Sequence, residues 1–187
     1  MIEYVTAKTV RDIEQILELQ QDNLPPNLNK EQIASQGFVT VHHSFDILQK
    51  MNSIEQSIIA KENDKVVGYL LAMTRESRNG IPVLIPMFKV FDNVTYKNKK
   101  IAAYNYIVVG QVCIAEGYRG KGILDDCYSA YKNHFKKKYD FAITEIHKKN
   151  LRSLKAHVRI GFENIHSYTD PNGDQWEVVI WDWKKEI

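Results

Sequence analysis

Residues 107–128, IVVGQVCIAEGYRGKGILDDCY, decide the fold, because they predict a strand, an anion-binding loop and a helix in direct succession. Apart from Gly110, residues 107–114 form the largely β-branched run that is typical of a strand buried on both faces. The next stretch, residues 117–122, places three glycines where the backbone must turn and present bare N–H groups. Apolar residues then recur at helical spacing, at Ile123, Cys127, Tyr131 and Phe135. Because a helix start has unpaired N–H donors and a positive dipole end, the loop predicts a phosphate site.

The bulk composition is that of an ordinary globular protein. The chain has 187 residues, 44% of them apolar and 26% charged, with a net charge of +2, so we expect one domain over residues 1–187. A charge this close to neutral gives no argument for nucleic acid as a partner. No apolar run reaches membrane-spanning length and the start lacks a signal-peptide pattern, so we expect a cytoplasmic protein with no membrane partner. Cys113 and Cys127 lack CxxC spacing, which favours core residues over a disulfide or metal site.

The other predicted elements surround this stretch. We expect strands at residues 2–5, 57–62, 65–74, 141–146, 163–168 and 176–183, and helices from Thr9, from Asn29, around 45–51 and over 150–160. The strand at 141–146 should lie parallel to the strand at 107–114, since strand, helix and strand in sequence form a right-handed βαβ unit. The lysines at 136–138 should complete the helix from Ile123. In the last helix, Leu151, Leu154 and Val158 should share one face, and Gly161 should end it.

Residues 75–104 have the weakest pattern of the chain. Asn79 and Gly80 predict a turn, and Pro82 and Pro86 interrupt an apolar patch. A connection of this length inside a compact domain is usually functional or poorly ordered. We therefore predict an acceptor-side insert here, a lid or wall for a second substrate.

Two common phosphate loops do not fit the glycines. A P-loop needs a Ser or Thr after its GK pair, and residues 117–123 have none there. A dinucleotide fingerprint needs a third glycine where Asp125 stands. The flanking hairpins also argue against a doubly wound dinucleotide fold.

A third pattern matches. Arg119-Gly-Lys-Gly122-Ile-Leu124, after a strand and before a helix, resembles the Q/R-x-x-G-x-G/A motif of the GCN5-related N-acetyltransferase (GNAT) superfamily. Residues 150–162 resemble the second signature of that family, with Asn150, Ser153, His157 and Gly161-Phe162 at its spacing. The resemblance covers the chain in outline, while its motifs occupy residues 112–162. It implies an α/β (α+β) fold with a mixed, mostly antiparallel sheet of six to seven strands. It also implies a central parallel pair of strands that splays at its C-terminal end, and about four helices that flank the sheet.

The resemblance also implies acetyl-coenzyme A (acetyl-CoA) as cosubstrate, with no metal. Its predicted binding residues are Val112, Cys113, Ile114, Arg119, Gly120, Lys121, Gly122, Ile123, Leu124, Asn150 and Ser153. Loop N–H groups would hold the pyrophosphate, and the pantetheine arm would pair with the strand at residues 112–114. Leu124 departs from the usual Gly or Ala, and His157 replaces the usual Tyr. Lys148, Lys149, Arg152 and Lys155 are either contacts for the 3′-phosphate or a solvated helix face.

The implied reaction is transfer of the acetyl group to a primary amine by direct attack in a ternary complex. It needs no enzyme-bound intermediate, so Cys113 as nucleophile is a minor alternative. His157 could protonate the leaving thiolate or could only pack. The candidates for the base are Glu116, Glu145 and His147, and each could instead have only a structural role.

Three matters stay open in the sequence. A degenerate family member that binds CoA or a partner without turnover is the alternative function, and nucleic-acid binding through the basic stretch 132–159 is a third. The acceptor is either a small-molecule or a peptide amine. A homodimer is also open, since the tryptophans of the last hairpin could form an exposed patch.

Overall fold

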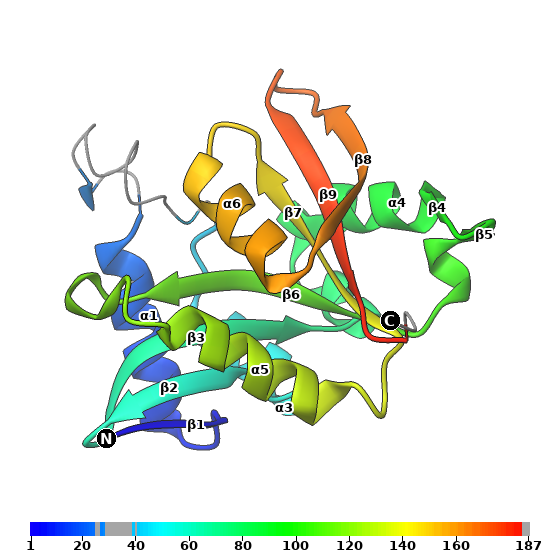
Figure 1. Cartoon of the computed structure of the whole chain (residues 1–187). Helices are drawn as coiled ribbons and strands as arrows, with labels where there is room; N and C mark the ends of the chain where they lie inside the picture. Colours follow the sequence, from blue (N-terminus) through cyan, green and yellow to red (C-terminus); the bar gives the residue numbers. More distant parts are fainter. Residues whose placement is uncertain (25–26, 29–38, 40, 185–187) are drawn as a thin grey trace.

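The computed structural model describes residues 1–24, 27–28, 39 and 41–184, and one sheet runs through them (Figure 1). Its seven strands lie in the order β1-β2-β3-β6-β7-β9-β8, with β6 and β7 parallel and every other neighbouring pair antiparallel. The strands are β1 Ile2–Thr6, β2 Ile58–Glu62, β3 Lys65–Met73, β6 Tyr106–Ile114, β7 Phe141–His147, β8 Glu163–Thr169 and β9 Gln175–Asp182. This arrangement confirms the predicted fold class.

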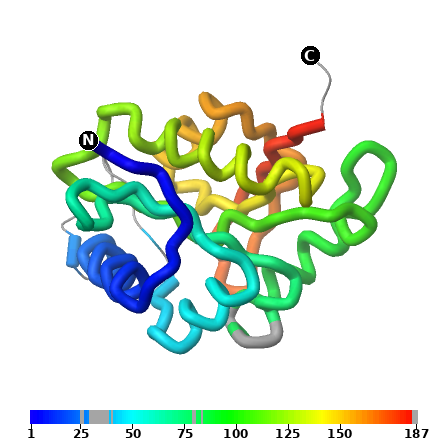
Figure 2. Tube along the Cα trace, turned by 90° about the horizontal axis from the view of Figure 1, so that it is seen from below, coloured from blue at the N-terminus to red at the C-terminus, as the bar shows by residue number. Residues whose placement is uncertain are grey.

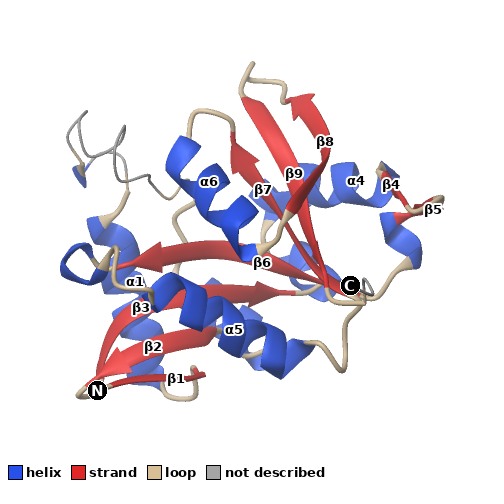
Figure 3. Cartoon of the chain, in the orientation of Figure 1, coloured by secondary structure: helices blue, strands red, loops and turns tan. Residues whose placement is uncertain are grey.

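Helices cover both faces of the sheet (Figure 3). The described residues contain five α-helices, where the sequence predicted about four: α1 Val10–Asp22, α3 Phe45–Ile54, α4 Ile85–Asn93, α5 Ile123–Phe135 and α6 Leu151–Ile160. Side chains of α1, α3 and α4 share one buried cluster with one face of the sheet, and those of α5 share the other. Figure 2 shows α1 and α5 on opposite sides of the strands. The site described below lies at an end of this layered structure.

The first helix begins as the sequence predicted. The Thr9 side chain accepts a hydrogen bond from the Asp12 amide, and the Asp12 carboxylate accepts one from the Thr9 amide, which completes a capping box. The helix ends at Asp22 with Asn23 as its C-cap, before Leu24. Asn23 thereby reaches the cavity described below.

The segment 75–104 is more regular than its sequence pattern suggested. It contains 3-10 turns, the helix α4 and a small hairpin of β4 Thr95–Tyr96 and β5 Lys99–Lys100. Phe88 and Phe91 of α4 are fully buried in the core. Pro86 lies in the first turn of α4, where its missing N–H has no intrahelical partner to lose. The proline therefore begins an ordered helix and does not break the apolar patch.

The predicted apolar face of α6 is wrong. Leu151 is 60% exposed and Val158 is 65% exposed, while Leu154 is only half-buried. The fully buried side chain of this helix is His157. Its hydrogen bonds allow a polar residue to occupy the inward face, so the hydrophobic spacing in the sequence pointed to the wrong side of the helix.

Two predictions about surface features also need correction. Helix α5 ends at Phe135, and residues 136–138 form turns beyond it instead of its last turn. All three tryptophans of the final hairpin are half-buried, and Trp181 and Trp183 pack on the α5 side of the sheet, so they form no exposed patch. The helix predicted from Asn29 lies outside the described residues.

The parallel strands separate toward their C-terminal ends. Residues 106–108 of β6 pair with residues 141–143 of β7, and the pairing stops there. Beyond this point β6 continues against β3, and β7 continues against β9 as far as His147. A bulge on β6 between Val109 and Val112 turns the strand further. An opening therefore forms between two strands whose outer neighbours hold them apart.

Candidate active site

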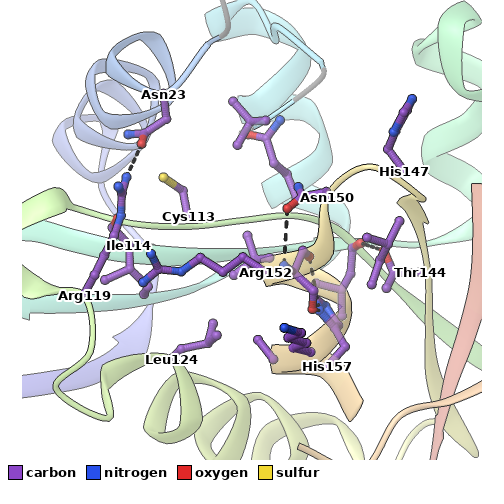
Figure 4. Close-up of a pocket in the computed structure, with 18 of the residues that line it drawn as sticks. Asn23, Cys113, Ile114, Arg119, Leu124, Thr144, His147, Asn150, Arg152 and His157 are labelled. Atoms are coloured by element: carbon purple, nitrogen blue, oxygen red, sulfur yellow. Dashed lines mark hydrogen bonds between the residues drawn. The ribbon is translucent and has the colours of Figure 1, made fainter. Parts of the chain in front are cut away.

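A cavity of about 750 Å³ occupies this opening. Figure 4 shows the ends of β6 and β7, the glycine loop and α6 around it. Of the eleven predicted binding residues, nine line it: Val112, Cys113, Ile114, Arg119, Gly120, Gly122, Leu124, Asn150 and Ser153. The other two lie elsewhere. Ile123 is buried in the core beneath the loop, and Lys121 is exposed with its ammonium 5.6 Å from the centre of the Tyr118 ring.

The glycine loop has the backbone that its sequence predicted. Gly120 and Gly122 adopt φ values of +73° and +81°, a region that L side chains rarely enter. A Cβ at either position would meet nothing within 4 Å, so the requirement for glycine is conformational and not steric. Helix α5 begins directly after Gly122, and no side chain caps it. Its first N–H groups therefore face the loop without intrahelical partners.

Arg119 lines the cavity and holds the glycine loop in place by hydrogen bonds. Its Nε donates to the Ile114 carbonyl at 2.8 Å, and its Nη2 donates to the Asn23 side chain at the end of α1. Figure 4 shows Asn23 and Arg119 joined in this way. The guanidinium therefore fixes the loop against both the end of β6 and the end of α1.

The start of α6 brings positive charge to the same cavity. Asn150 caps the helix, with its side-chain oxygen accepting from the Ser153 amide at 3.3 Å. Arg152 and Lys155 follow within the first turns and line the cavity. Arg159 bonds both carboxylate oxygens of Asp125, at 3.2 and 2.7 Å, and so connects α6 to the first turn of α5. Phosphate groups would meet a cationic surface here.

His157 lines the cavity but is only 2% exposed. Its Nδ1 lies 2.8 Å from the Ser153 carbonyl, which can only accept, so Nδ1 carries the proton. Its Nε2 then accepts from the Tyr128 hydroxyl at 2.6 Å. Burial lowers the pKa of His157 to about 4. A neutral imidazole with both nitrogens occupied suits the packing role better than proton donation.

Glu145 lies on β7 just beyond the point of separation, and it lines the cavity. Its Oε2 accepts a hydrogen bond from the Tyr168 hydroxyl at 2.5 Å. Burial raises the pKa of Glu145 to about 7, the Tyr168 hydrogen bond opposes this rise, and the charge of Asp170 adds to it. A carboxylate with a pKa near neutrality is suited to accept and release a proton.

The other two candidate bases are placed differently. His147 lines the cavity, with Nε2 3.2 Å from an Asp174 oxygen and Nδ1 accepting from the Lys149 amide at 3.1 Å. Both of its nitrogens therefore have hydrogen-bond partners. Glu116 begins an exposed 3-10 turn and is not among the residues that line the cavity.

Cys113 borders the cavity from β6 as a buried thiol. Burial raises its pKa to about 12, against the lowering effect of Arg119. The nucleophilic form of cysteine is the thiolate, which this environment disfavours. The geometry therefore gives no support to Cys113 as a nucleophile.

Sequence motifs did not point to Tyr168, which contacts the Glu145 carboxylate. The antiparallel register places Tyr168 opposite Trp176, and Trp176 opposite His147. Tyr168 therefore reaches Glu145 across β9, from the neighbouring row of the sheet. Only the pairing of three strands brings these residues together. The correct strand register for residues 163–168 and 176–183 would have predicted that Tyr168 lies near Glu145.

Two features are absent from the described residues. No three His, Cys, Asp or Glu side chains within that part of the chain gather into a group that could hold a metal ion. No described helix has the length and apolar character needed to cross a bilayer.

A mostly antiparallel sheet that opens between two parallel strands, next to a glycine loop at a helix start, defines the acetyltransferase fold class. The chain belongs to the Acetyltransferase (GNAT) family, whose family model matches residues 13–162. No curated protein sequence matches the chain.

Solved structures share this fold at low sequence identity. A GNAT-family acetyltransferase from Streptococcus agalactiae is 11% identical with a TM-score of 0.68, over 98% of this chain and 96% of that one. The ribosomal-protein-S18-alanine N-acetyltransferase from Escherichia coli is 10% identical with a TM-score of 0.64, over 100% and 97%. Arabidopsis thaliana Naa50, bound to the bisubstrate analogue CoA-Ac-MVNAL, is 13% identical with a TM-score of 0.59, over 96% and 97%. At these identities the likeness concerns the fold.

Proposed function

We propose that the protein is an acetyl-CoA-dependent N-acetyltransferase that transfers an acetyl group to a primary amine by direct attack in a ternary complex. The observation that carries the proposal is one cavity that joins the glycine loop to Glu145, a carboxyl with a pKa near 7. Family membership supports acetyl transfer. The Naa50 complex shows a coenzyme A conjugate bound to a protein of this fold.

The cosubstrate would lie along the cavity from the loop to the separated strands. N–H groups at Gly120, Gly122 and the start of α5 would hold the pyrophosphate. Arg152 and Lys155 would face its 3′-phosphate, and the pantetheine arm would pair with residues 112–114 as an added strand. Leu124 stands at the loop position closest to the pyrophosphate in this placement.

The chemistry follows from this placement. The amine nitrogen attacks the thioester carbonyl, and a backbone N–H of the β6 bulge region donates to the developing oxyanion. The carbon–sulfur bond breaks, the amine proton passes to Glu145, and the departing thiolate takes a proton from solvent. Glu145 then releases its proton to solvent, so the net proton count is zero and the base is restored. In this scheme His157 only positions the helix, and His147 orients the end of β7.

The acceptor would be a peptide amine or a small-molecule amine. The Escherichia coli enzyme of this fold is an N-acetyltransferase of a ribosomal-protein alanine, and the Naa50 complex holds the analogue CoA-Ac-MVNAL, which favours testing peptide N-termini first. The alternative function is binding of CoA without turnover, which the replacement of the usual Tyr by His157 favours. The position and raised pKa of Glu145 favour catalysis over that alternative.

The test combines binding with turnover. Acetyl-CoA should raise the melting temperature, and release of the CoA thiol should appear with at least one amine of a panel of peptides, polyamines and amino acids. Glu145→Gln should lower kcat by about 10²- to 10⁴-fold, the usual range for loss of a general base, while acetyl-CoA still stabilises the protein.

Glu116→Gln is the matched control, because Glu116 is an exposed carboxylate outside the cavity lining. Its activity should equal that of the unmodified chain. Stabilisation by acetyl-CoA without turnover of any amine would support the binding-only alternative. Absence of stabilisation would contradict both functions.

A further inference from the structure

The Tyr168 hydroxyl is bonded to the carboxyl group at the centre of the proposed reaction. It donates to Glu145 Oε2 at 2.5 Å, and no other described residue hydrogen-bonds that carboxylate. We propose that Tyr168 is a positioning residue, which holds Oε2 so that Oε1 faces the amine, and which favours the ionised form of the carboxylate. This inference rests on the proposed function of Glu145.

Tyr168 is held firmly enough for this role. It lies on β8 in register with Trp176 of β9, so the sheet fixes its backbone. Its ring is half-buried against the core cluster on the α1 side and lies nearly parallel to the His166 ring, at 6.3 Å between centres. A rigid ring directs the O–H without the loss of side-chain freedom that a flexible donor would incur.

The hydroxyl also lowers the pKa of Glu145 against two effects that raise it. Burial raises the pKa of this carboxyl, and Asp170, on the loop after β8, raises it further by its negative charge. Although desolvation acts the other way, hydrogen bonds from the Asp174 amide and the Trp176 indole lower the pKa of Asp170, so it stays charged. On β7 itself, His147 shares the face of Glu145 but bonds Asp174.

Removal of the hydroxyl should therefore raise the pKa of Glu145. In the phenylalanine variant, burial and Asp170 would act on Glu145 without the opposing hydrogen bond, so the pKa of Glu145 rises above its present value of about 7. A base acts only when ionised, so the acidic limb of the rate profile must move to higher pH. The variant should therefore lose much activity at pH values below the new limb and little activity at pH values above it.

The experiment is the pH profile of kcat/KM for Tyr168→Phe, with the amine found for the unmodified enzyme. We expect the acidic limb to move up by about one pH unit, which is roughly a tenfold loss below the limb. The matched control is Tyr139→Phe, because Tyr139 also donates to a carboxylate, Glu55, at 2.7 Å, and neither residue lines the cavity. That variant should keep the original limb.

A second readout does not depend on turnover. Carbon-13 NMR of labelled glutamate carboxyls follows the titration of Glu145 directly, identified by its loss in Glu145→Gln. Its midpoint should be higher in Tyr168→Phe than in the unmodified chain. An unchanged midpoint and an unchanged limb would overturn the role of Tyr168, whereas full activity in Glu145→Gln would instead overturn the proposed base.

Discussion

His157 is a buried imidazole whose two nitrogens are both used inside the protein. The Ser153 carbonyl and the Tyr128 hydroxyl fix its tautomer, and the Phe162 ring packs on it edge to face with centres 4.9 Å apart. Its residue type and its position in the sequence fit an acid and a packing residue equally well. The difference lies in Tyr128, which is 29 residues away and comes from another helix.

Proton chemistry at His157 can be measured directly. Burial lowers its pKa to about 4, so the side chain should stay neutral from pH 8 down to pH 5, with the proton on Nδ1. Long-range nitrogen-15 NMR of the imidazole will report both the tautomer and the titration. A midpoint between pH 6 and 7 would contradict the structure and restore His157 as a candidate acid.

At the scale of elements, the loop before α5 is where the sequence was most informative. Gly120 and Gly122 adopt positive φ values, which explains why the sequence has glycine at both positions. The strand and the start of the helix there were predicted within a residue of their observed bounds, while the helix ends at Phe135, before the three lysines that were expected to complete it. Local backbone requirements of this kind are encoded in adjacent residues, so a sequence displays them.

A matched pair of glycines tests the loop. Gly122→Ala should weaken acetyl-CoA binding by about tenfold, because a Cβ at φ +81° costs roughly 1–2 kcal/mol and shifts the N–H groups. Gly117→Ala should leave affinity unchanged, since Gly117 has no positive φ and a Cβ there meets nothing within 4 Å. Isothermal titration calorimetry measures both. Equal affinities in the two variants would argue against phosphate binding by this loop.

Helix α6 shows where an element's sequence misleads. Apolar spacing grouped Leu151 and Val158 on one face, and the structure exposes both because the inward position belongs to His157. A hydrophobic pattern cannot show that a polar side chain will find partners on another helix. In contrast, the ends of α6 were predicted correctly, because Asn150 and Gly161 act through the local backbone.

At the scale of the whole molecule, the opening between β6 and β7 depends on residues far apart in the chain. Gln111, in the β6 bulge, accepts from Gln20 at 2.7 Å and from Tyr69 at 2.6 Å, and donates to the Val41 carbonyl at 2.8 Å. These partners are 91, 42 and 70 residues away. This buried network fixes the bulge against α1 and β3. The sequence predicted the parallel pair, but not what keeps its ends apart.

The central claim is that this opening holds acetyl-CoA. The most direct measurement is amide NMR of the isotope-labelled protein during titration with acetyl-CoA. The account predicts saturable shifts at residues 112–114, at Gly120 and Gly122 and at the start of α6, with little change at β1 and β2 on the far edge of the sheet. Absence of shifts at millimolar acetyl-CoA, or shifts confined to residues outside the cavity, would contradict it.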